Sequence, residues 1–181
     1  DRPSAARRRF HAIAHVTAIV ATIDPIEPTH DQLTDLLPCC ERDPEEMYVD
    51  LKGELAKVQH PAMRALVDAF LGDEPLMASF KRAPAAKMMH HAYLGGLLEH
   101  TLSLLRLGGA VLPLYPKVNA DLVRVGLFLH DIGKTRELSY DKGFTYTDRG
   151  ELIGHIVEGA IMVHDKAQQV MTTQGIRFPK N

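Results

Sequence analysis

The sequence contains no tryptophan and only two cysteines among its 181 residues. The two are adjacent, Cys39 and Cys40, and neighbouring cysteines rarely form a disulfide with each other. This usage is typical of a reducing compartment, so we expect a cytoplasmic protein. No apolar run approaches the roughly 18 residues that a membrane-spanning helix requires, so we expect no membrane partner.

Neither sign of charge is in large excess, because 21 lysines and arginines face 23 aspartates and glutamates, for a net charge of −2. This balance argues neither for nor against nucleic acid, and any binding of a polyanion must be local. Histidine, in contrast, is abundant. The ten histidines are the one compositional hint of metal chemistry.

The first part of the chain differs in pattern from the rest. Residues 10–23 are rich in β-branched side chains, which predicts one or two strands. Residues 24–28 contain Pro25 and Pro28 and predict a rigid linker at a domain boundary. From Thr29 onward the pattern is helical, with helices expected over 44–59, 61–71 and 74–80 that carry no obvious chemistry.

A long helix is expected next, over residues 86–111, and it contains His90, His91 and His100. At 100° per residue, His100 shares a face with Leu97, Leu104 and Leu107 and is predicted to point toward the core. The pair Gly95-Gly96 inside a helix costs about 1–2 kcal/mol relative to alanine. Either a substrate or crossing helix approaches this backbone closely, or the glycines serve tight helix packing alone.

The next helix, over residues 120–132, is apolar almost all round, which predicts a central, buried position. It ends in the string His130-Asp131-Ile132-Gly133-Lys134. Burial of an unpaired carboxylate costs several kcal/mol or more, and a metal ion would satisfy both His130 and Asp131. Gly133 can adopt the left-handed conformation that ends many helices.

A small hairpin, with strands over 137–140 and 144–147, and a helix opened by Asp148 complete the pattern. The inner face of this helix is predicted to consist of Leu152, His155, Ile156, Gly159, Met162 and Val163. Three helices therefore each direct a histidine inward, and a carboxylate lies beside one of them. Nitrogen and oxygen ligands of this kind suit zinc, manganese, iron or cobalt, and spacing alone does not distinguish these metals.

These strings resemble a known family. Residues 130–134, with the upstream His100 and the downstream Gly154-His155, resemble the HD superfamily of metal-dependent phosphohydrolases. The strings 90–101, 129–134 and 144–155 resemble, more narrowly, the YhaM-type 3′-5′ exoribonucleases, in which an OB-fold precedes an HD domain. The resemblance implies an all-α fold: an HD-domain helical bundle with a small β-hairpin over 29–181, preceded over 1–28 by a β remnant of an OB-fold and its linker.

The resemblance also implies roles for individual residues. The metal ligands would be His100, His130, Asp131 and His155, the last of them binding either a second metal or the substrate phosphate. Asp131 and Lys134 would be the catalytic residues, with Lys134 facing the phosphate. The residues near the mouth of the site would be His91 and His90.

The implied activity is divalent-metal-dependent hydrolysis of phosphodiesters, from the 3′ end of single-stranded RNA and also of DNA, with release of mononucleotides. We expect Mn²⁺ or Co²⁺ as the cofactor, with iron, zinc, nickel or magnesium as alternatives. A homo-oligomer is compatible with the sequence.

One departure and two alternatives accompany this interpretation. Members of the family continue beyond the equivalent of Asn181 with a His-His pair and a final metal-binding aspartate, so we expect an HD domain that is truncated in this sequence. The first alternative is an HD phosphohydrolase acting on a nucleotide, such as a dNTP, a cyclic nucleotide or an alarmone. The second is a degenerate, non-catalytic HD scaffold.

Overall fold

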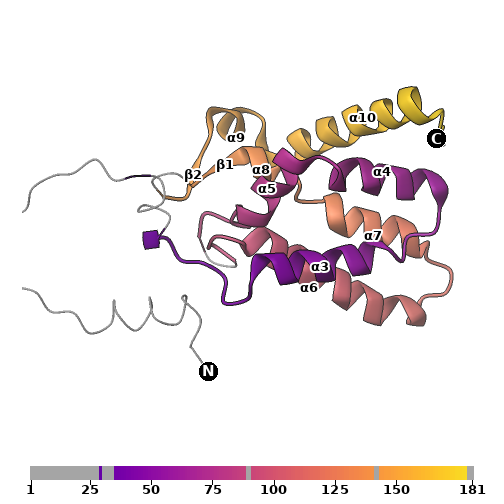
Figure 1. Cartoon of the computed structure of the whole chain (residues 1–181), viewed down its shortest axis with the longest axis horizontal. Coiled ribbons are helices and arrows are strands. Elements are labelled where there is room, and N and C mark those ends of the chain that lie inside the picture. The colour runs from indigo at the N-terminus through magenta and orange to yellow at the C-terminus, as the bar shows by residue number, and fades with distance from the viewer. Residues whose placement is uncertain (1–28, 30–34, 89–90, 141–142, 179–181) are drawn as a thin grey trace, which may run out of the picture.

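The computed structural model describes Thr29 and residues 35–88, 91–140 and 143–178 (Figure 1). The strands expected over 10–23, the linker over 24–28 and His90 lie outside the described residues. Within them the fold is mostly helical, in the order α3 (Pro44–Leu55), α4 (Pro61–Leu71), α5 (Glu74–Arg82), α6 (Gly96–Val111), the 3-10 turn η1 (Leu112–Leu114), α7 (Ala120–Leu129), α8 (Lys134–Glu137), β1 (Leu138–Ser139), β2 (Thr145–Tyr146), α9 (Asp148–Leu152) and α10 (Gly154–Gln174). None of the helices in the described part is long and apolar enough to cross a membrane.

Several helices begin at a side-chain cap. The Asp43 carboxylate accepts a hydrogen bond from the Glu45 amide at the start of α3, and Pro44 occupies the first helical position. The Asn119 side chain accepts hydrogen bonds from the first amides of α7 in the same way. The expected hairpin is also present, because β1 and β2 pair antiparallel with Leu138 opposite Tyr146.

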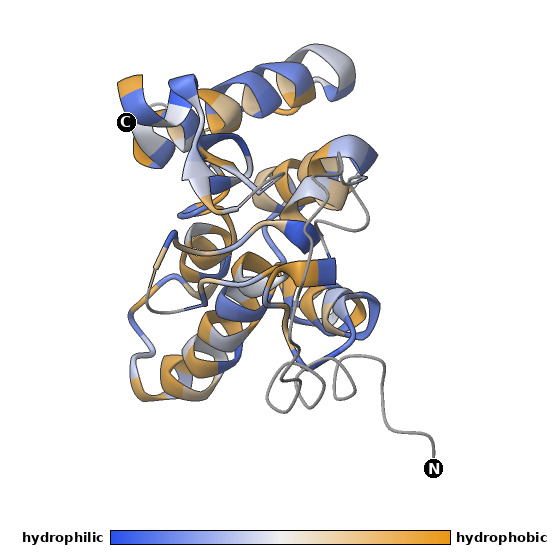
Figure 2. Ribbon diagram, turned by 90° about the vertical axis from the view of Figure 1, so that its left-hand side faces the viewer, coloured by the Kyte–Doolittle hydropathy of each residue, from blue (hydrophilic) through white to orange (hydrophobic). Residues whose placement is uncertain are grey.

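The core lies between α3, α4, α5, α6 and α7, and its centre is aromatic. Phe128 of α7 is fully buried, and its ring meets Phe70 of α4 and Phe80 of α5 edge to face, at centroid distances of 6.2 and 6.0 Å. Hydrophobic and hydrophilic residues alternate along the ribbons of several helices, as expected of helices that bury one face (Figure 2). The apolar sides of α6 and α7 thus fix the elements that carry His100 and His130.

The helix predicted over 86–111 was wrong at its start, because α6 begins only at Gly96. Gly95 precedes it with φ of 82°, in the left-handed region that favours glycine. A Cβ on Gly96 would overlap the carbonyl oxygen of His91, so the chain folds back on itself at this point. The glycine pair therefore does mark a close approach to the backbone, but by the preceding loop, and Leu107 is exposed rather than on the inner face.

The end of α7 also differs from the prediction. The helix ends at Leu129, and Asp131 and Ile132 form a turn that leads into α8. Gly133 has φ of −62°, so the expected left-handed conformation is wrong. A side chain at this position would instead overlap the carbonyl oxygen of His155. Glycine is required here because α10 crosses the turn at backbone contact, which places His155 beside Asp131.

The helix predicted from Asp148 is two helices. Thr147, rather than Asp148, caps α9 through a hydrogen bond that its hydroxyl accepts from the Gly150 amide. Gly154 then has φ of 76°, which separates α9 from α10 and changes the face that is buried. Leu152 and Ile156 are consequently exposed, Ile156 to 73%, whereas Gly159 and Met162 are buried as predicted. Ile156 borders an apolar groove of about 540 Å³ between α4, α7 and α10.

An ion cluster around one buried carboxylate holds α8, α9 and α10 together. Glu158 of α10 is only 2% exposed, and its carboxylate accepts hydrogen bonds of 2.7 Å from Arg136 and from Arg149. Burial acts to raise the pKa of Glu158, but the two arginine hydrogen bonds outweigh it and hold this pKa below its ordinary value of 4.5. The folded state therefore favours the carboxylate.

We predict that Glu158→Gln lowers the free energy of unfolding at pH 7 by about 1–3 kcal/mol, because both arginines lose a charged partner. Since the pKa of Glu158 is depressed in the folded state, its contribution is complete above the unfolded pKa and is lost as the pH falls below it. The gap between wild type and variant should narrow below pH 4.5. Urea unfolding followed by circular dichroism, repeated from pH 7 downward, measures this difference in the free energy of unfolding between wild type and Glu158→Gln.

The matched control is Glu46→Gln, an exposed acid on α3, for which we expect a change within about 0.5 kcal/mol at every pH. A gap for Glu158→Gln that stays constant down the pH series would contradict the assignment of its stabilising effect to the ionised carboxylate.

Candidate metal centre

Asp131 lies at the centre of the site, in the turn between α7 and α8, and is only 7% exposed. Lys134 Nζ donates a hydrogen bond of 2.7 Å to its Oδ2 atom. Three imidazoles approach the same carboxylate through their Nε2 atoms: His130 at 3.2 Å, His100 at 3.6 Å and His155 at 3.6 Å. Residues from α6, the end of α7, α8 and α10 thus converge on one buried anion.

The surroundings of Asp131 keep it ionised. Burial acts to raise its pKa, but hydrogen bonds with His130 and Lys134 outweigh this and hold the pKa well below its usual range. The hydrogen bond with Asp131 raises the pKa of His130, and burial lowers the pKa of His100. The carboxylate is therefore a ready anionic ligand, and His100 tends toward the neutral form in which imidazole binds metals.

Three of these side chains have the arrangement that a metal ion needs. One ligand atom each from His100, His130 and Asp131 lies within 4.8 Å of the other two. The rings of His100 and His130 are 5.5 Å apart and inclined at 51°, so they are not stacked on each other. Two imidazole nitrogens and a carboxylate oxygen form a donor set that suits a divalent transition metal. His100, His130 and Asp131 therefore fit the divalent metal ion that the sequence predicts.

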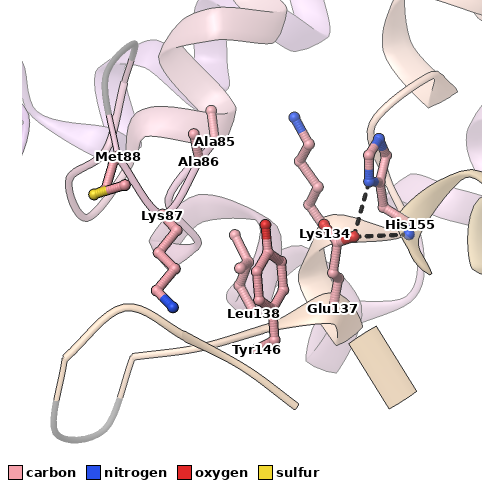
Figure 3. A pocket seen from close by; sticks show the side chains of 9 residues that line it. All are labelled: Ala85, Ala86, Lys87, Met88, Lys134, Glu137, Leu138, Tyr146 and His155. Carbon is pink, nitrogen blue, oxygen red and sulfur yellow. Dashed lines mark hydrogen bonds and ion pairs between the residues drawn. The ribbon is translucent and has the colours of Figure 1, made fainter. Parts of the chain in front are cut away.

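Hydrogen bonds on the far side of two imidazoles orient them toward the centre. The Nδ1 atom of His130 is 2.9 Å from the Leu127 carbonyl oxygen, which can only accept, so Nδ1 carries a proton. The Nε2 atom, which faces Asp131, is therefore the nitrogen left to bind a metal when the ring is neutral. His155 Nδ1 donates in the same way to the Glu137 carboxylate at 2.9 Å, which also accepts from the His155 amide (Figure 3). Such outer partners are typical of metal-binding histidines.

His91 lies next to this group rather than within it. Its ring centroid is 5.4 Å from that of His100. Its Nδ1 atom is 2.7 Å from the Tyr93 hydroxyl, which in turn donates to the Glu99 carboxylate at 2.7 Å. Burial and the hydrogen bond to Glu99 both raise the pKa of Tyr93, which keeps this hydroxyl protonated as a donor.

The structure brings together the predicted residues His100, His130, Asp131, Lys134 and His155, with His91 beside them. Sequence reasoning missed Glu137, Tyr93 and Glu99, which orient histidines without touching Asp131. Glu137 lies one helical turn after Lys134, and this spacing was the one available signal. Tyr93 and Glu99 fall within the string 90–101, where the wrong helix start obscured their pairing with His91.

An open cleft of about 490 Å³ adjoins the centre, and Lys134, Glu137 and His155 line one end of it (Figure 3). The opposite end is lined by Lys87 and Met88, with Tyr146 and Leu138 between the two ends (Figure 3). A substrate in this cleft would have one end beside the His–Asp cluster.

Comparison with known proteins identifies the domain. Residues 97–172, which include all of His100, His130, Asp131 and His155, match a family model described as HD domain. The chain carries an HD domain. Such a domain implies a divalent metal, for which His100, His130 and Asp131 are the candidate site.

The HD domain of this chain has distant relatives among exoribonucleases. The 3′-5′ exoribonuclease YhaM of Oceanobacillus iheyensis is 37% identical over 125 residues, which cover 69% of this chain and 39% of that protein. The protein of the same name from Shouchella clausii is 34% identical over 136 residues, 75% of this chain and 41% of the relative. The protein of the same name from Listeria innocua is 46% identical over 112 residues, which cover 62% of this chain and 35% of that protein. The chain thus spans well under half the length of these relatives. No solved structure matches it significantly.

We predict that the protein binds Mn²⁺ and that Asp131→Asn weakens this binding by more than about 100-fold, because loss of even an outer-shell partner typically costs 10–100-fold. Isothermal titration calorimetry measures the affinity, and circular dichroism checks that the variant folds.

The matched control is His164→Ala, which removes an exposed histidine from α10 and should leave the affinity unchanged. Equal Mn²⁺ affinities for wild type and Asp131→Asn would show that this cluster is not the binding site.

Proposed function

We propose that this chain carries out divalent-metal-dependent hydrolysis of phosphodiesters, as a 3′-5′ exoribonuclease that releases mononucleotides from single-stranded RNA and also acts on DNA. The observation that carries the proposal is the cluster of His100, His130 and Asp131, with ligand atoms within 4.8 Å of one another, next to an open cleft. The names of the relatives, 3′-5′ exoribonuclease YhaM, support the choice of RNA as substrate.

In this proposal His100, His130 and Asp131 hold the divalent ion, and His155 binds either a second ion or the substrate phosphate. The ligand types favour Mn²⁺ or Co²⁺, with iron, zinc, nickel or magnesium as alternatives. Lewis-acid activation of water and of the phosphoryl group is the chemistry that such an ion supplies.

The chain's own residues supply positioning and charge. Lys134 lies between Asp131 and the cleft, so its ammonium group can neutralise charge that develops on a phosphoryl oxygen. Glu137 fixes the ring of His155, so that its Nε2 atom faces Asp131 and the cleft end. His91 is proposed to lie near the mouth of the site. Its ring is held there by a hydrogen bond with the Tyr93 hydroxyl, which in turn donates to Glu99. His90 is proposed for the same region.

We further propose a cellular location, an extent for the HD domain and an assembly state. We propose the cytoplasm as the location, in keeping with the low cysteine content and the free thiols of Cys39 and Cys40. The HD domain is proposed to extend over 29–181, beyond the matched residues 97–172 on both sides. Homo-oligomer formation stays a prediction.

A nucleotide-hydrolysing HD enzyme is the second candidate. A cleft of about 490 Å³ could hold a free nucleotide as readily as the end of a strand, and the His–Asp centre would act on either. A degenerate HD scaffold is a third candidate. The cluster of His100, His130 and Asp131 disfavours it, because the ligand atoms lie within 4.8 Å of one another.

We predict that the protein with Mn²⁺ degrades single-stranded RNA labelled at its 5′ end to a ladder of shortened products, and releases a mononucleotide at once from RNA labelled at its 3′ end. Lys134→Ala should lower kcat by about 10²–10³-fold, since removal of one group that stabilises developing charge has this effect in other enzymes. Lys117→Ala, an exposed lysine before α7, is the control and should keep full activity.

The nucleotide alternative is tested in the same assay with a panel of dNTPs, cyclic nucleotides and alarmones. Hydrolysis of one of these with intact RNA would replace the proposed substrate. If the protein hydrolyses neither RNA nor any of these nucleotides and also binds no transition metal, the non-catalytic scaffold is the hypothesis that remains.

A further inference from the structure

Tyr146 of the hairpin presents an aromatic ring to the cleft. Strand pairing places Tyr146 directly opposite Leu138, so both side chains lie on the same face of the hairpin. Leu138 is 4% exposed, whereas Tyr146 is 43% exposed. Leu138 thus supports the hairpin from within the fold, and the ring of Tyr146 retains an accessible surface. An exposed ring of this kind in a cleft is suited to stacking.

A cation accompanies this ring. Lys87 comes from the segment that follows α5, and its Nζ atom lies 5.4 Å from the centroid of the Tyr146 ring. Both residues line the cleft (Figure 3). A lysine within about 6 Å of an aromatic face is attracted to it through a cation–π interaction. Lys87 also adds a positive charge to this end of the cleft.

The two ends of the cleft differ in chemistry. At the end near Asp131, the polar side chains of Lys134, Glu137 and His155 are already engaged with one another or with Asp131. Leu138 and the ring of Tyr146 lie between the ends, and Ala85 and Ala86 line the cleft near Met88 and Lys87, so this part of the lining is largely apolar (Figure 3). Such a lining offers a nucleobase an apolar surface but few hydrogen-bonding groups that could distinguish one base from another.

We propose that Tyr146 and Lys87 form a stacking subsite for the nucleobase of the 3′-terminal nucleotide, an inference that rests on the proposed function. In 3′-to-5′ trimming, this nucleotide carries the scissile phosphate on its 5′ side. With that phosphate beside Lys134 and His155, the base extends along the apolar lining to the ring of Tyr146. Recognition by stacking is tolerant of sequence, because every base has a π face. The subsite therefore selects for the presence of a base and not for its identity.

The test compares two substrates with two variants. Tyr146→Leu keeps an apolar cover over Leu138 but removes the π face, and Tyr146→Phe keeps the π face. The substrates are an RNA oligonucleotide and the same oligonucleotide with an abasic 3′-terminal nucleotide. We expect Tyr146→Leu to lower kcat/KM on the intact RNA by roughly 5- to 150-fold, mainly through KM, because base–aromatic stacking has this strength.

On the abasic substrate, Tyr146→Leu should change kcat/KM by less than about twofold, since there is no base to stack. Tyr146→Phe should resemble wild type on both substrates. The control Tyr115→Leu, an exposed tyrosine between η1 and α7, should affect neither. If Tyr146→Leu reduces activity equally on both substrates, Tyr146 has only a structural role and the proposal is overturned.

A binding measurement separates this inference from the proposed function. Ligand-observed NMR compares AMP with ribose 5-phosphate, which lacks the base. Wild type should bind AMP at least fivefold more tightly, and Tyr146→Leu should abolish this preference. If RNA is not hydrolysed but the preference for AMP over ribose 5-phosphate depends on Tyr146, the stacking subsite is supported and the proposed exoribonuclease activity is wrong. If RNA is hydrolysed but AMP and ribose 5-phosphate bind equally, the subsite is wrong.

Discussion

The burial of the Asp131 carboxylate is the constraint on which the rest of this structure depends. A buried carboxylate costs several kcal/mol unless charged or hydrogen-bonding partners surround it. Lys134 supplies one direct ion pair, and imidazoles from three different elements approach the remaining positions. Because these partners come from distant parts of the chain, the helices that carry them must meet at one point.

Two close approaches of the backbone make that meeting possible. Gly133 lets α10 cross the turn after α7 at contact distance, which places His155 at the carboxylate. Gly96 lets the loop that carries His91 fold back onto the start of α6, beside His100. A side chain at either glycine would push apart the elements that form the centre. The glycines are therefore as much part of the site's architecture as the histidines.

The heart of the site could be predicted from the sequence because it is local. His130 and Asp131 are neighbours in the chain. His100 and His155 do approach the same carboxylate, but each stays 29% exposed at the edge of the core rather than within the predicted apolar face. The start of α6 could not be predicted, because apolar periodicity continues through residues 86–95 and hides the positive φ of Gly95. The exposure of Leu107 and Ile156 depends on which helices pack together, and Gly154 changes the face that α10 buries. Glu137 was missed because its role is a tertiary contact with His155.

The most direct test of the account is the anomalous diffraction of a crystal grown with Mn²⁺. The account predicts a strong anomalous peak with His100 Nε2, His130 Nε2 and an Asp131 oxygen each about 2.0–2.3 Å away, the range typical of such ligands. It further predicts that His155 lies beside this peak or at a second one. A well-ordered crystal with no peak between these side chains, or with manganese bound elsewhere in the chain, would contradict it.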